Sequence, residues 1–389
     1  MGNVNSILAR FDADLSQRMR SGMHRTRRAI TSVQGPIVII AGKELLNFSS
    51  NDYLGLAAHP ELLDTLKRAV DVHGVGAGAS QLVCGHSVVH AELEEALAKF
   101  TGRQRALVFS SGYLANLAVA SSMVNRESII IEDRLDHASL IDAARLSQAR
   151  LNRYRHADIE DAERILKKHH LKTKLVLTDG VFSMDGDIAP LKPLTSLCRK
   201  YDAMLMVDDA HGFGVLGKKG GGVLEHLGLD SNEVPILMGT FGKSLGVMGA
   251  FVAGDETLIE VLIQKARSYI YTTALPPAVA VTVTRALGLV EHEGWRRDHL
   301  NNLINQFRRG CQQLGLKISP SETAIQPLVI GDPREAIQVS ERLYKKGILI
   351  PAIRPPTVPP GTSRLRISLS AAHEGSQINY LLESLDAVL

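Results

Sequence analysis

The stretch Val234-Pro-Ile-Leu-Met-Gly-Thr-Phe-Gly-Lys-Ser-Leu-Gly246 joins a short apolar run to a lysine that stands among glycines. The apolar residues predict a buried strand, and Lys243 follows its carboxyl end. Small neighbours let a bulky group approach the amine, and partial burial favours the neutral form that attacks an aldehyde. The alternatives are an ordinary loop lysine and a phosphate-loop lysine. The Walker pattern fails because Leu237 stands where that pattern requires glycine.

Apolar runs of the same kind recur before this stretch and alternate with helical patterns. Such runs predict parallel strands that are buried on both faces of an open sheet. The ligands of such sheets bind beyond the carboxyl ends of the strands. The expected strands are 105–109, 128–132, 175–178, 204–207 and 236–239, and the expected helices are 60–72, 137–146 and 158–169.

The two ends of the chain show different patterns. The beginning predicts a basic helical arm and a short hairpin, and the end predicts a smaller α+β domain. We therefore expect an arm and hairpin over 1–45, a large α/β domain over 46–285 and a small domain over 286–389. The elements expected in these end regions are a helical arm over 1–30, a hairpin over 37–40 and 45–46, strands at 325–330, 348–353 and 365–369, and helices at 295–314, 334–346 and 377–385.

The composition is that of an ordinary globular protein, with 45% hydrophobic and 22% charged residues in a chain of 389. The net charge of +3 is too small to indicate nucleic acid or membranes as partners. Cys84, Cys198 and Cys311 form no CxxC pair and no metal-ligand spacing, so we expect neither a disulfide scaffold nor a metal site. No apolar run is long enough to span a bilayer, and we expect a cytoplasmic protein.

A second motif, Met206-Val-Asp-Asp-Ala-His-Gly212, places two acids at the end of an expected strand. A carboxylate there can keep a pyridine nitrogen protonated, which makes the ring an electron sink. His211 can donate a hydrogen bond to the phenolic oxygen of such a ring. The alternatives are a magnesium site like that of Walker B and a structural pair of acids. The magnesium site is disfavoured because no phosphate loop is present.

Three further motifs also follow expected strands. Ser110-Ser-Gly-Tyr113 lies before a helix, whose N-terminal amides suit a phosphate. His137 can lie flat on an aromatic cofactor, and Ser183 can donate a hydrogen bond to its ring oxygen. Taken singly, these motifs have simpler interpretations as a capped helix, a core histidine and a turn. Because all the motifs follow strands, they gather along one edge of the sheet and together predict a single cofactor site.

Together the motifs resemble the α-oxoamine synthases, a branch of the fold-type I enzymes that use pyridoxal 5′-phosphate (PLP). The resemblance implies an α/β fold like that of aspartate aminotransferase, with a mainly parallel seven-stranded sheet between helices. It also implies a homodimer with shared active sites. It runs from about Asn47 to Val388 and is carried by Asn47–Gly55, Ser87–His90, Asp133–Leu140, Val181–Gly186, Val207–Gly212 and Thr240–Ser244.

The resemblance also implies a role for each residue that matches a family motif. Lys243 would carry the cofactor, Asp208 would pair with its pyridine nitrogen, and His137 would stack on its ring, while His211 and Ser183 would face the ring oxygen. The phosphate would contact Gly112, Tyr113 and Thr240 of one subunit and Thr273 of the other. The implied catalytic residues are Lys243, His137, Asp208 and His211, and the implied substrate-binding residues are Arg25 (or Arg27 in a shifted alignment), Asn51, His137, Arg354 and Thr357.

The stretch Ala352–Pro359 resembles most the biotin-pathway branch of the family, which condenses L-alanine with a pimeloyl thioester of coenzyme A or acyl carrier protein and releases carbon dioxide. Cys84-Gly85 and residues 139–155 are closer to a sister branch that joins glycine to acetyl-CoA. The synthesis of 5-aminolevulinate or of sphingoid bases stays open as well, and so does a catalytically silent scaffold subunit. The presence of Lys243 argues against the scaffold. A nucleotide-binding module is disfavoured because no GxGxxG or Walker loop follows a strand.

Overall fold

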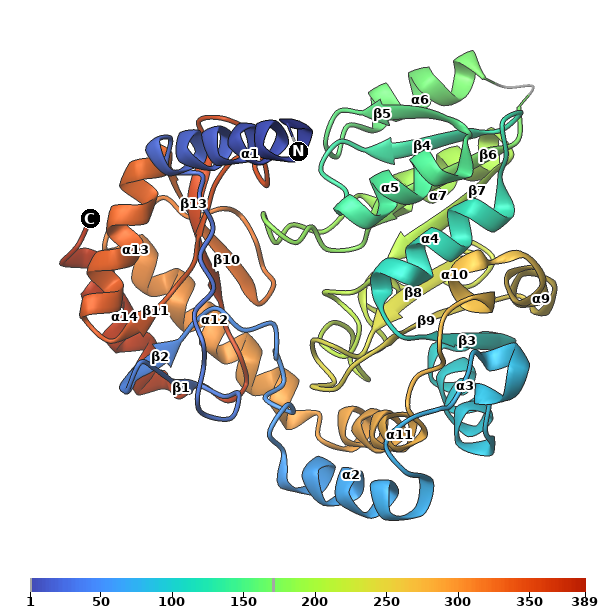
Figure 1. Ribbon diagram of the computed structural model, residues 1–389, viewed down its shortest axis with the longest axis horizontal. Helices are drawn as coiled ribbons and strands as arrows, with labels where there is room; N and C mark the ends of the chain where they lie inside the picture. The colour runs from blue at the N-terminus through green and yellow to red at the C-terminus, as the bar shows by residue number, and fades with distance from the viewer. Residues whose placement is uncertain (1, 170–171) are drawn as a thin grey trace. The chain divides into compact units, whose positions relative to one another are not determined.

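The computed structural model describes residues 2–169 and 172–389 and divides into two compact units (Figure 1). The first unit contains Met1–Ser50, Met184–Gly186 and Asn301–Leu389. The second contains Asn51–Ser183 and Asp187–Leu300. The two ends of the chain therefore fold together in one unit, and the middle of the chain forms the other.

The second unit is built on a seven-stranded sheet in the order β3-β9-β8-β7-β6-β4-β5. The strands from β4 to β8 pair in parallel, and β9 is antiparallel to both of its neighbours. The predicted α/β fold with a mainly parallel sheet is confirmed. The strands are β3 (Arg105–Phe109), β4 (Ile129–Asp133), β5 (Arg150–Tyr154), β6 (Lys174–Asp179), β7 (Ala203–Asp208), β8 (Ile236–Thr240) and β9 (Ala250–Gly254).

Helices cover both faces of this sheet. Along β6, Leu175 and Leu177 belong to one hydrophobic cluster and Val176 to the other, so both faces of the strand are buried as the apolar runs predicted. One cluster includes residues of α4 (Gly112–Met123), α5 (Ala138–Ser147) and α9 (Glu256–Lys265). The other includes residues of α2 (Pro60–His73), α3 (Val88–Thr101), α6 (Ile159–Lys168), α7 (Leu191–Lys200), α8 (Val223–Leu227) and α11 (Pro277–His292). The unit also contains a π-helical turn, Gln81–Gly85, and α10 (Arg267–Ile270).

The helix boundaries follow from local chemistry in the sequence. The Asp158 side chain accepts a hydrogen bond from the Asp161 amide and caps α6, and Ser111 caps α4 in the same way through the Leu114 amide. Helix α2 has Pro60 in its first turn and ends before Gly74, which adopts a positive φ of 74°. These ends lie within one or two residues of the predicted ones.

The first unit contains two small sheets. Strands β1 (Ile37–Ile40) and β2 (Lys43–Asn47) form the predicted hairpin, and β11 (Ile348–Leu349) pairs in parallel with β2. The second sheet has the order β10-β13-β12 and is antiparallel. Its strands are β10 (Ile325–Gly331), β13 (Ser363–Ser368) and β12 (Ala352–Ile353). The helices of the first unit are α1 (Gly2–Arg20), α13 (Pro333–Lys345) and α14 (Gly375–Asp386), and α12 (Trp295–Gln313) begins in the second unit and ends in the first.

Two predicted elements of these end regions differ from the structure. The single strand expected over 348–353 is wrong, because the segment forms two short strands that pair in different sheets on either side of Ile350 and Pro351. A proline has no amide hydrogen to donate, so it interrupts strand pairing. The helical arm expected over 1–30 ends at Arg20, and Gly22 turns the chain with a φ of 69°.

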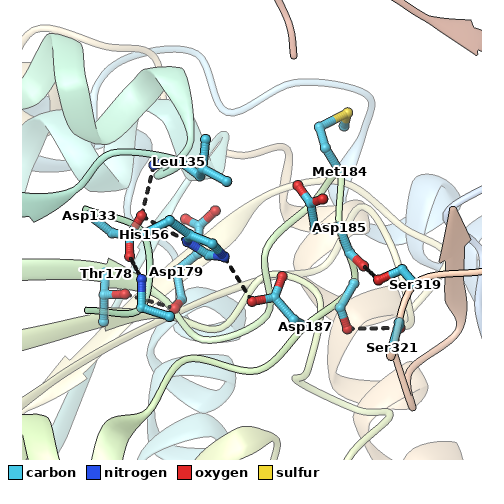
Figure 2. Close-up of polar contacts among 12 residues, drawn as sticks. Asp133, Leu135, His156, Thr178, Asp179, Met184, Asp185, Asp187, Ser319 and Ser321 are labelled. Carbon is cyan, nitrogen blue, oxygen red and sulfur yellow. Dashed lines mark hydrogen bonds and ion pairs between the residues drawn. The ribbon is translucent and has the colours of Figure 1, made fainter. Parts of the chain in front are cut away.

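Residues Met184–Gly186 fold with the first unit through polar contacts at both ends of the segment. The Gly186 carbonyl accepts hydrogen bonds from Ser321 Oγ and Thr323 Oγ1, each at 2.9 Å. Asp185 pairs with the guanidinium of Arg364, and its carbonyl accepts from Ser319 Oγ (Figure 2). The segment is thus held by side chains from the C-terminal part of the chain.

Three features of the described residues bear on the class of protein. The three cysteines are free thiols, and burial raises the pKa of Cys198 and of Cys311 to about 12. No described helix is both long enough and apolar enough to cross a membrane. Among the described residues, no group of three or more histidine, cysteine or acidic side chains could hold a metal ion.

Candidate active site

A cavity of about 180 Å³ in the second unit lies where the motifs follow their strands. Its walls come from the loops after β3, β4, β6, β7 and β8, as expected for an open parallel sheet. All of the predicted cofactor-binding residues except Thr273 line this cavity. The lining residues are Gly112, Tyr113, His137, Asp179, Ser183, Asp208, Ala210, His211, Met238, Thr240 and Lys243.

Lys243 extends into the cavity from the loop after β8. Its Nζ lies 2.7 Å from His211 Nε2, and His211 Nδ1 lies 2.7 Å from the hydroxyl of Tyr53. The Tyr53 hydroxyl also donates to Asn51 Oδ1 at 3.1 Å. The predicted lysine and histidine are therefore joined directly. Sequence reasoning missed the part of Tyr53, although this residue lies within the family motif Asn47–Gly55.

Asp208 is a buried carboxylate at the end of β7. Its Oδ2 accepts a hydrogen bond from Asn116 Nδ2 at 2.7 Å, and its Oδ1 accepts from the Ala210 amide at 3.0 Å. Two donors fix the orientation of the group. Sequence reasoning missed Asn116, because a single buried asparagine in the apolar helix α4 carries no local signal.

His137 caps the N-terminus of α5, with its backbone amide donating to Asp179 Oδ1 at 3.4 Å. Its Nδ1 accepts from the Ser139 amide at 3.3 Å, which leaves Nε2 as the protonated nitrogen of a neutral ring. The ring is open to the cavity, yet desolvation by the surrounding protein lowers its pKa. The charge of Asp208 opposes this effect and the charge of Lys243 adds to it. A neutral, flat ring at this edge is suited to stacking on an aromatic group.

The amides at the start of α4 form the part of the cavity that suits an anion. Helix α4 begins at Gly112 directly after its cap, Ser111. A Cβ at Gly112 would lie 3.4 Å from the Met238 side chain, which is an ordinary van der Waals contact. Thr240 is 9% exposed, and its hydroxyl donates to the Gly249 carbonyl at 2.9 Å. These groups match the predicted phosphate site.

A cluster of acids lies beside the cavity, and one histidine contacts two of its members (Figure 2). Burial raises the pKa of Asp136 and of Asp179, and the neighbouring negative charges raise each pKa further. His156 lies between Asp133 and Asp187. Its Nδ1 lies 3.0 Å from Asp133 Oδ1, and its Nε2 lies 3.0 Å from Asp187 Oδ2. Burial works to lower the pKa of His156, but these hydrogen bonds and charges outweigh it and raise the pKa to about 10. Sequence reasoning did not single out this histidine.

The predicted substrate-binding residues of the first unit line a separate cavity of about 760 Å³. Arg25, Arg354 and Thr357 all contribute to its wall, and Arg27, the residue of the shifted alignment, does not. The Arg354 guanidinium donates to the Gly22 carbonyl and, at 3.4 Å, to that of His24. Burial and the nearby charge of Arg25 lower the pKa of Arg354. Asn51 belongs to the second unit, where its Oδ1 accepts from Tyr53.

The chemistry of the first cavity fits PLP. It offers an amine for the aldehyde, an oriented carboxylate for the ring nitrogen, an imidazole for a ring face and a helix N-terminus for the phosphate. Thr273 does not line the cavity of its own chain and is exposed. The fold and this set of groups together define a PLP-dependent transferase of the aspartate aminotransferase type.

Comparisons with known proteins agree with this class. The family model "Aminotransferase class I and II" matches residues 43–385. The 8-amino-7-oxononanoate synthase of Thioalkalivibrio sulfidiphilus is 54% identical over 374 residues, which are 96% of this chain and 95% of that one. The protein of the same name from Methylococcus capsulatus is 56% identical over 366 residues, 94% of this chain and 95% of that one.

Solved structures show the same similarity. A structure of serine palmitoyltransferase with PLP superposes with a TM-score of 0.94 at 31% identity, covering 99% of this chain and 98% of that one. The serine palmitoyltransferase of Sphingomonas wittichii gives 0.91 at 32% identity, covering 100% and 97%. The 8-amino-7-oxononanoate synthase of Francisella tularensis gives 0.78 at 32% identity, covering 88% and 97%.

The chain therefore belongs to the aminotransferase class I and II family and, within it, to the α-oxoamine synthases, beside the 8-amino-7-oxononanoate synthases. The predicted family and fold are confirmed. The predicted enzyme class, a PLP-dependent C-acyltransferase, and the predicted function are those of these relatives, and both are confirmed at that level.

Proposed function

We propose that the chain condenses L-alanine with a pimeloyl thioester and releases carbon dioxide and the thiol, which is the reaction of an 8-amino-7-oxononanoate synthase. The observation that carries the proposal is the cavity in which Lys243, Asp208, His137 and His211 converge. The full-length similarity to enzymes of that name supports the same activity. Together they argue for the biotin-pathway branch over the branch that uses glycine and acetyl-CoA.

Each residue of the cavity has a distinct task in this reaction. Bound PLP supplies a protonated ring that accepts negative charge from the α-carbon of the amino acid. Lys243 would hold the cofactor and move the α-proton through Nζ, and the hydrogen bond between Lys243 and His211 positions the amine. Asp208, oriented by Asn116, would keep the positive charge on the ring nitrogen. Because charge develops at the α-carbon, these fixed groups supply much of the rate gain.

The remaining side chains would bind the phosphate and the ring. Gly112, Tyr113 and Thr240, which line the cavity, would hold the phosphate at the start of α4. Ser183 and His211 would face the ring oxygen. His137 would cover one face of the ring and exclude water from it.

Candidate substrate-binding residues are present in each unit. Arg354 would pair with the carboxylate of the amino acid, since a guanidinium matches a planar carboxylate with two hydrogen bonds. Arg25 and Thr357, which line the same cavity of the first unit, would contact the acyl substrate. Asn51 would contact the amino acid in the second unit. The acyl donor is a thioester of coenzyme A or of acyl carrier protein.

A homodimer with shared sites is part of the same proposal. Thr273 is exposed and forms an isolated bridge with Ser80. In the family's arrangement this segment reaches the phosphate held by the neighbouring subunit. Its exposure and its place outside the cavity of its own chain fit that role.

The direct test replaces the amine. Lys243→Ala should keep the fold but lose turnover and the covalent pyridoxyl adduct that borohydride reduction leaves on the wild-type lysine. The matched control is Lys219→Ala, an exposed lysine that should retain both. Mass spectrometry of the reduced, digested protein locates the adduct, and wild-type turnover by Lys243→Ala would contradict the proposal.

A second test identifies the substrates. The purified enzyme is offered L-alanine or glycine, each with pimeloyl-CoA or acetyl-CoA, and the products are identified by mass spectrometry. The proposal expects 8-amino-7-oxononanoate from alanine and the pimeloyl thioester as the main product. A clear preference for glycine with acetyl-CoA would place the chain in the sister branch instead.

A further inference from the structure

We propose that His156 is a positively charged positioning residue that holds the hairpin bearing Ser183 against the end of β4. This inference rests on the proposed function, because Ser183 matters only as a contact of the bound cofactor. The hairpin is closed by the bridge between Val181 and Ile188 and by the Phe182 amide, which donates to the Asp187 carbonyl at 3.0 Å. The contacts that carry the inference join residues of the second unit, whereas the tip of the hairpin, Met184–Gly186, belongs to the first.

The geometry fixes the charge of the ring. His156 Nδ1 lies 3.0 Å from Asp133 Oδ1, and Nε2 lies 3.0 Å from Asp187 Oδ2 (Figure 2). An ionised carboxylate can only accept a hydrogen bond, so both ring nitrogens must donate and must both carry hydrogen. A ring with two N–H groups is an imidazolium cation. The raised pKa of about 10 agrees with this conclusion from the contacts.

One end of the bridge is a rigid anchor. Asp133 is buried at the end of β4, and its two oxygens also accept hydrogen bonds from the Leu135 and Ala157 amides, each at 2.8 Å. Its own amide donates to Asp136 Oδ2 at 2.9 Å. A carboxylate held by so many partners cannot follow a moving histidine, so the histidine takes its position from the strand.

The other end of the bridge lies next to the cofactor contact. Asp187 closes the hairpin against Phe182, and the Phe182 ring packs edge-on against His156 with 4.5 Å between the ring centroids. Phe182 is 1% exposed, so it has little room to shift. Ser183 is the next residue and lines the cavity. His156 therefore fixes the backbone on both sides of Ser183, through an ion pair at Asp187 and a ring contact at Phe182.

The charge also balances the surrounding acids. Asp133, Asp136, Asp179 and Asp187 lie close together, and the histidine contacts two of them directly. Removing one partner of such a pair leaves the other charge uncompensated, which costs more than the pair contributes. A neutral replacement should let Asp187 turn away and loosen the base of the hairpin at Phe182 and Ser183, while the tip stays held by Ser321 and Thr323.

The experiment compares holoenzymes of His156→Gln, Ser183→Ala and the double variant. The readouts are the dissociation constant of PLP, the pH midpoint of the cofactor's absorbance, and kcat separately from KM. Loss of one hydrogen bond to a charged group of the cofactor should weaken PLP binding about 10- to 100-fold in Ser183→Ala, and His156→Gln should weaken it by up to the same factor. The absorbance midpoint should shift in the same direction as in Ser183→Ala.

The double variant separates positioning from a general structural role. If His156 acts through Ser183, both substitutions remove the same contact between Ser183 and the cofactor. The dissociation constant of PLP in the double variant should then equal the larger of the two single-variant values. Fully additive losses, or a His156→Gln enzyme with the wild-type PLP affinity and absorbance midpoint, would overturn the inference. Asp187→Ala removes the other partner and should reproduce the effect, so it keeps the test decisive if His156→Gln does not fold.

The control is His226→Gln, on the exposed side of α8, which should leave every readout unchanged. The inference and the proposed function fail in distinguishable ways. If the wild-type protein carries no PLP on Lys243, the proposed function is wrong. If the wild type is loaded and active but the hairpin variants match it, only the role of His156 is wrong.

Discussion

Arg354 illustrates how a single side chain of this protein prepares for a ligand. Its guanidinium donates to the carbonyls of Gly22 and His24, so the side chain is already placed against the arm that follows α1. Desolvation and the like charge of Arg25 both lower its pKa. An incoming carboxylate would relieve that electrostatic cost, because it places a negative charge between the two arginines.

We predict that Arg354→Lys raises KM for the amino acid and changes kcat much less. A lysine keeps the charge but cannot make the two-pronged contact, and losing ~1.5–3 kcal/mol of charge-assisted hydrogen bonding corresponds to about a 10- to 100-fold increase in KM. Steady-state kinetics with varied L-alanine measure the change. The control is Arg342→Lys, an exposed residue of α13, and equal KM values in the two variants would argue against the assigned contact.

At the scale of elements, the turn that follows Lys243 depends on one glycine. Gly246 has a φ of 68°, and a Cβ there would lie 2.4 Å from the Ala57 backbone nitrogen. Gly228, at the end of α8, has the same φ of 68° with nothing within 4 Å of its Cβ. Alanine at Gly228 therefore costs only the free energy of the left-handed conformation. Alanine at Gly246 adds the cost of a clash with the backbone.

We predict that Gly228→Ala loses about 1–2 kcal/mol of unfolding free energy, the cost of a left-handed alanine. Gly246→Ala should lose clearly more than Gly228→Ala. It should also bind PLP less tightly, because the loop that carries Lys243 must shift. Denaturant unfolding and PLP titration measure the two effects. If Gly246→Ala and Gly228→Ala lose the same unfolding free energy and Gly246→Ala keeps the wild-type PLP affinity, the contact with Ala57 is not tight.

A half-buried acid joins α3 to β3. Glu94 Oε1 accepts from the Val108 amide at 3.0 Å, and burial raises the pKa of Glu94 to about 7, against smaller opposing effects of this hydrogen bond and of Arg105. A carboxyl whose folded pKa is raised stabilises the fold below its unfolded pKa of about 4.5 and loses that contribution as the pH rises through 7. At higher pH the ionised, poorly solvated group destabilises the helix–strand contact.

We predict that Glu94→Gln melts near the wild-type temperature at pH 4.5 and about 2–4 °C above it at pH 8. Glutamine keeps an oxygen for the Val108 amide and has no charge to desolvate. Melting curves across this pH range give the difference. The neighbouring exposed residue provides the control, Glu95→Gln, whose melting temperature should follow the wild type throughout. A constant offset of Glu94→Gln at all pH values would contradict the assignment.

At the scale of the whole molecule, the two ends of the chain fold into one unit and carry Arg25, Arg354 and Thr357, while the middle carries the cofactor cavity. The pairing of Ile348 with Leu46 in the sheet of β1, β2 and β11 shows how closely the ends are joined. The proposed dimer adds Thr273 from a second chain.

We predict that two inactive variants restore each other's activity when they are mixed. Lys243→Ala lacks the amine, and Thr273→Asp places a negative charge against the phosphate of the partner's site. A hybrid dimer then has one site with both lesions and one intact site. Random exchange makes half of the dimers hybrid, so the mixture should reach about a quarter of the wild-type activity.

Subunit exchange is confirmed by native mass spectrometry of the mixture. No recovery of activity despite confirmed exchange would show that the sites are not shared. Lys243→Ala mixed with wild type is the control, and its activity should fall only in proportion to dilution.

Features with a local signal could be predicted from the order of the residues alone. An apolar run that leads into a glycine-rich turn marks a buried strand and the loop after it. Lys243, Asp208, His211 and the helix cap at Ser111 could therefore be assigned to one edge of a parallel sheet. The ends of α2 and α6 were also predictable, because proline, glycine and aspartate act on the backbone within a few residues.

The partners that hold these groups in place became visible only in the folded chain. Asn116 orients Asp208 across 92 positions and Tyr53 reaches His211 across 158, and neither contact follows from a periodic pattern. The sequence also did not predict three other features. These are the contacts of His156 with two aspartates, the folding of the two chain ends into one unit, and the division of residues 348–353 between two sheets. Local sequence fixes backbone conformation and burial, whereas a contact between distant residues depends on how whole elements pack, and that packing is a property of the complete fold.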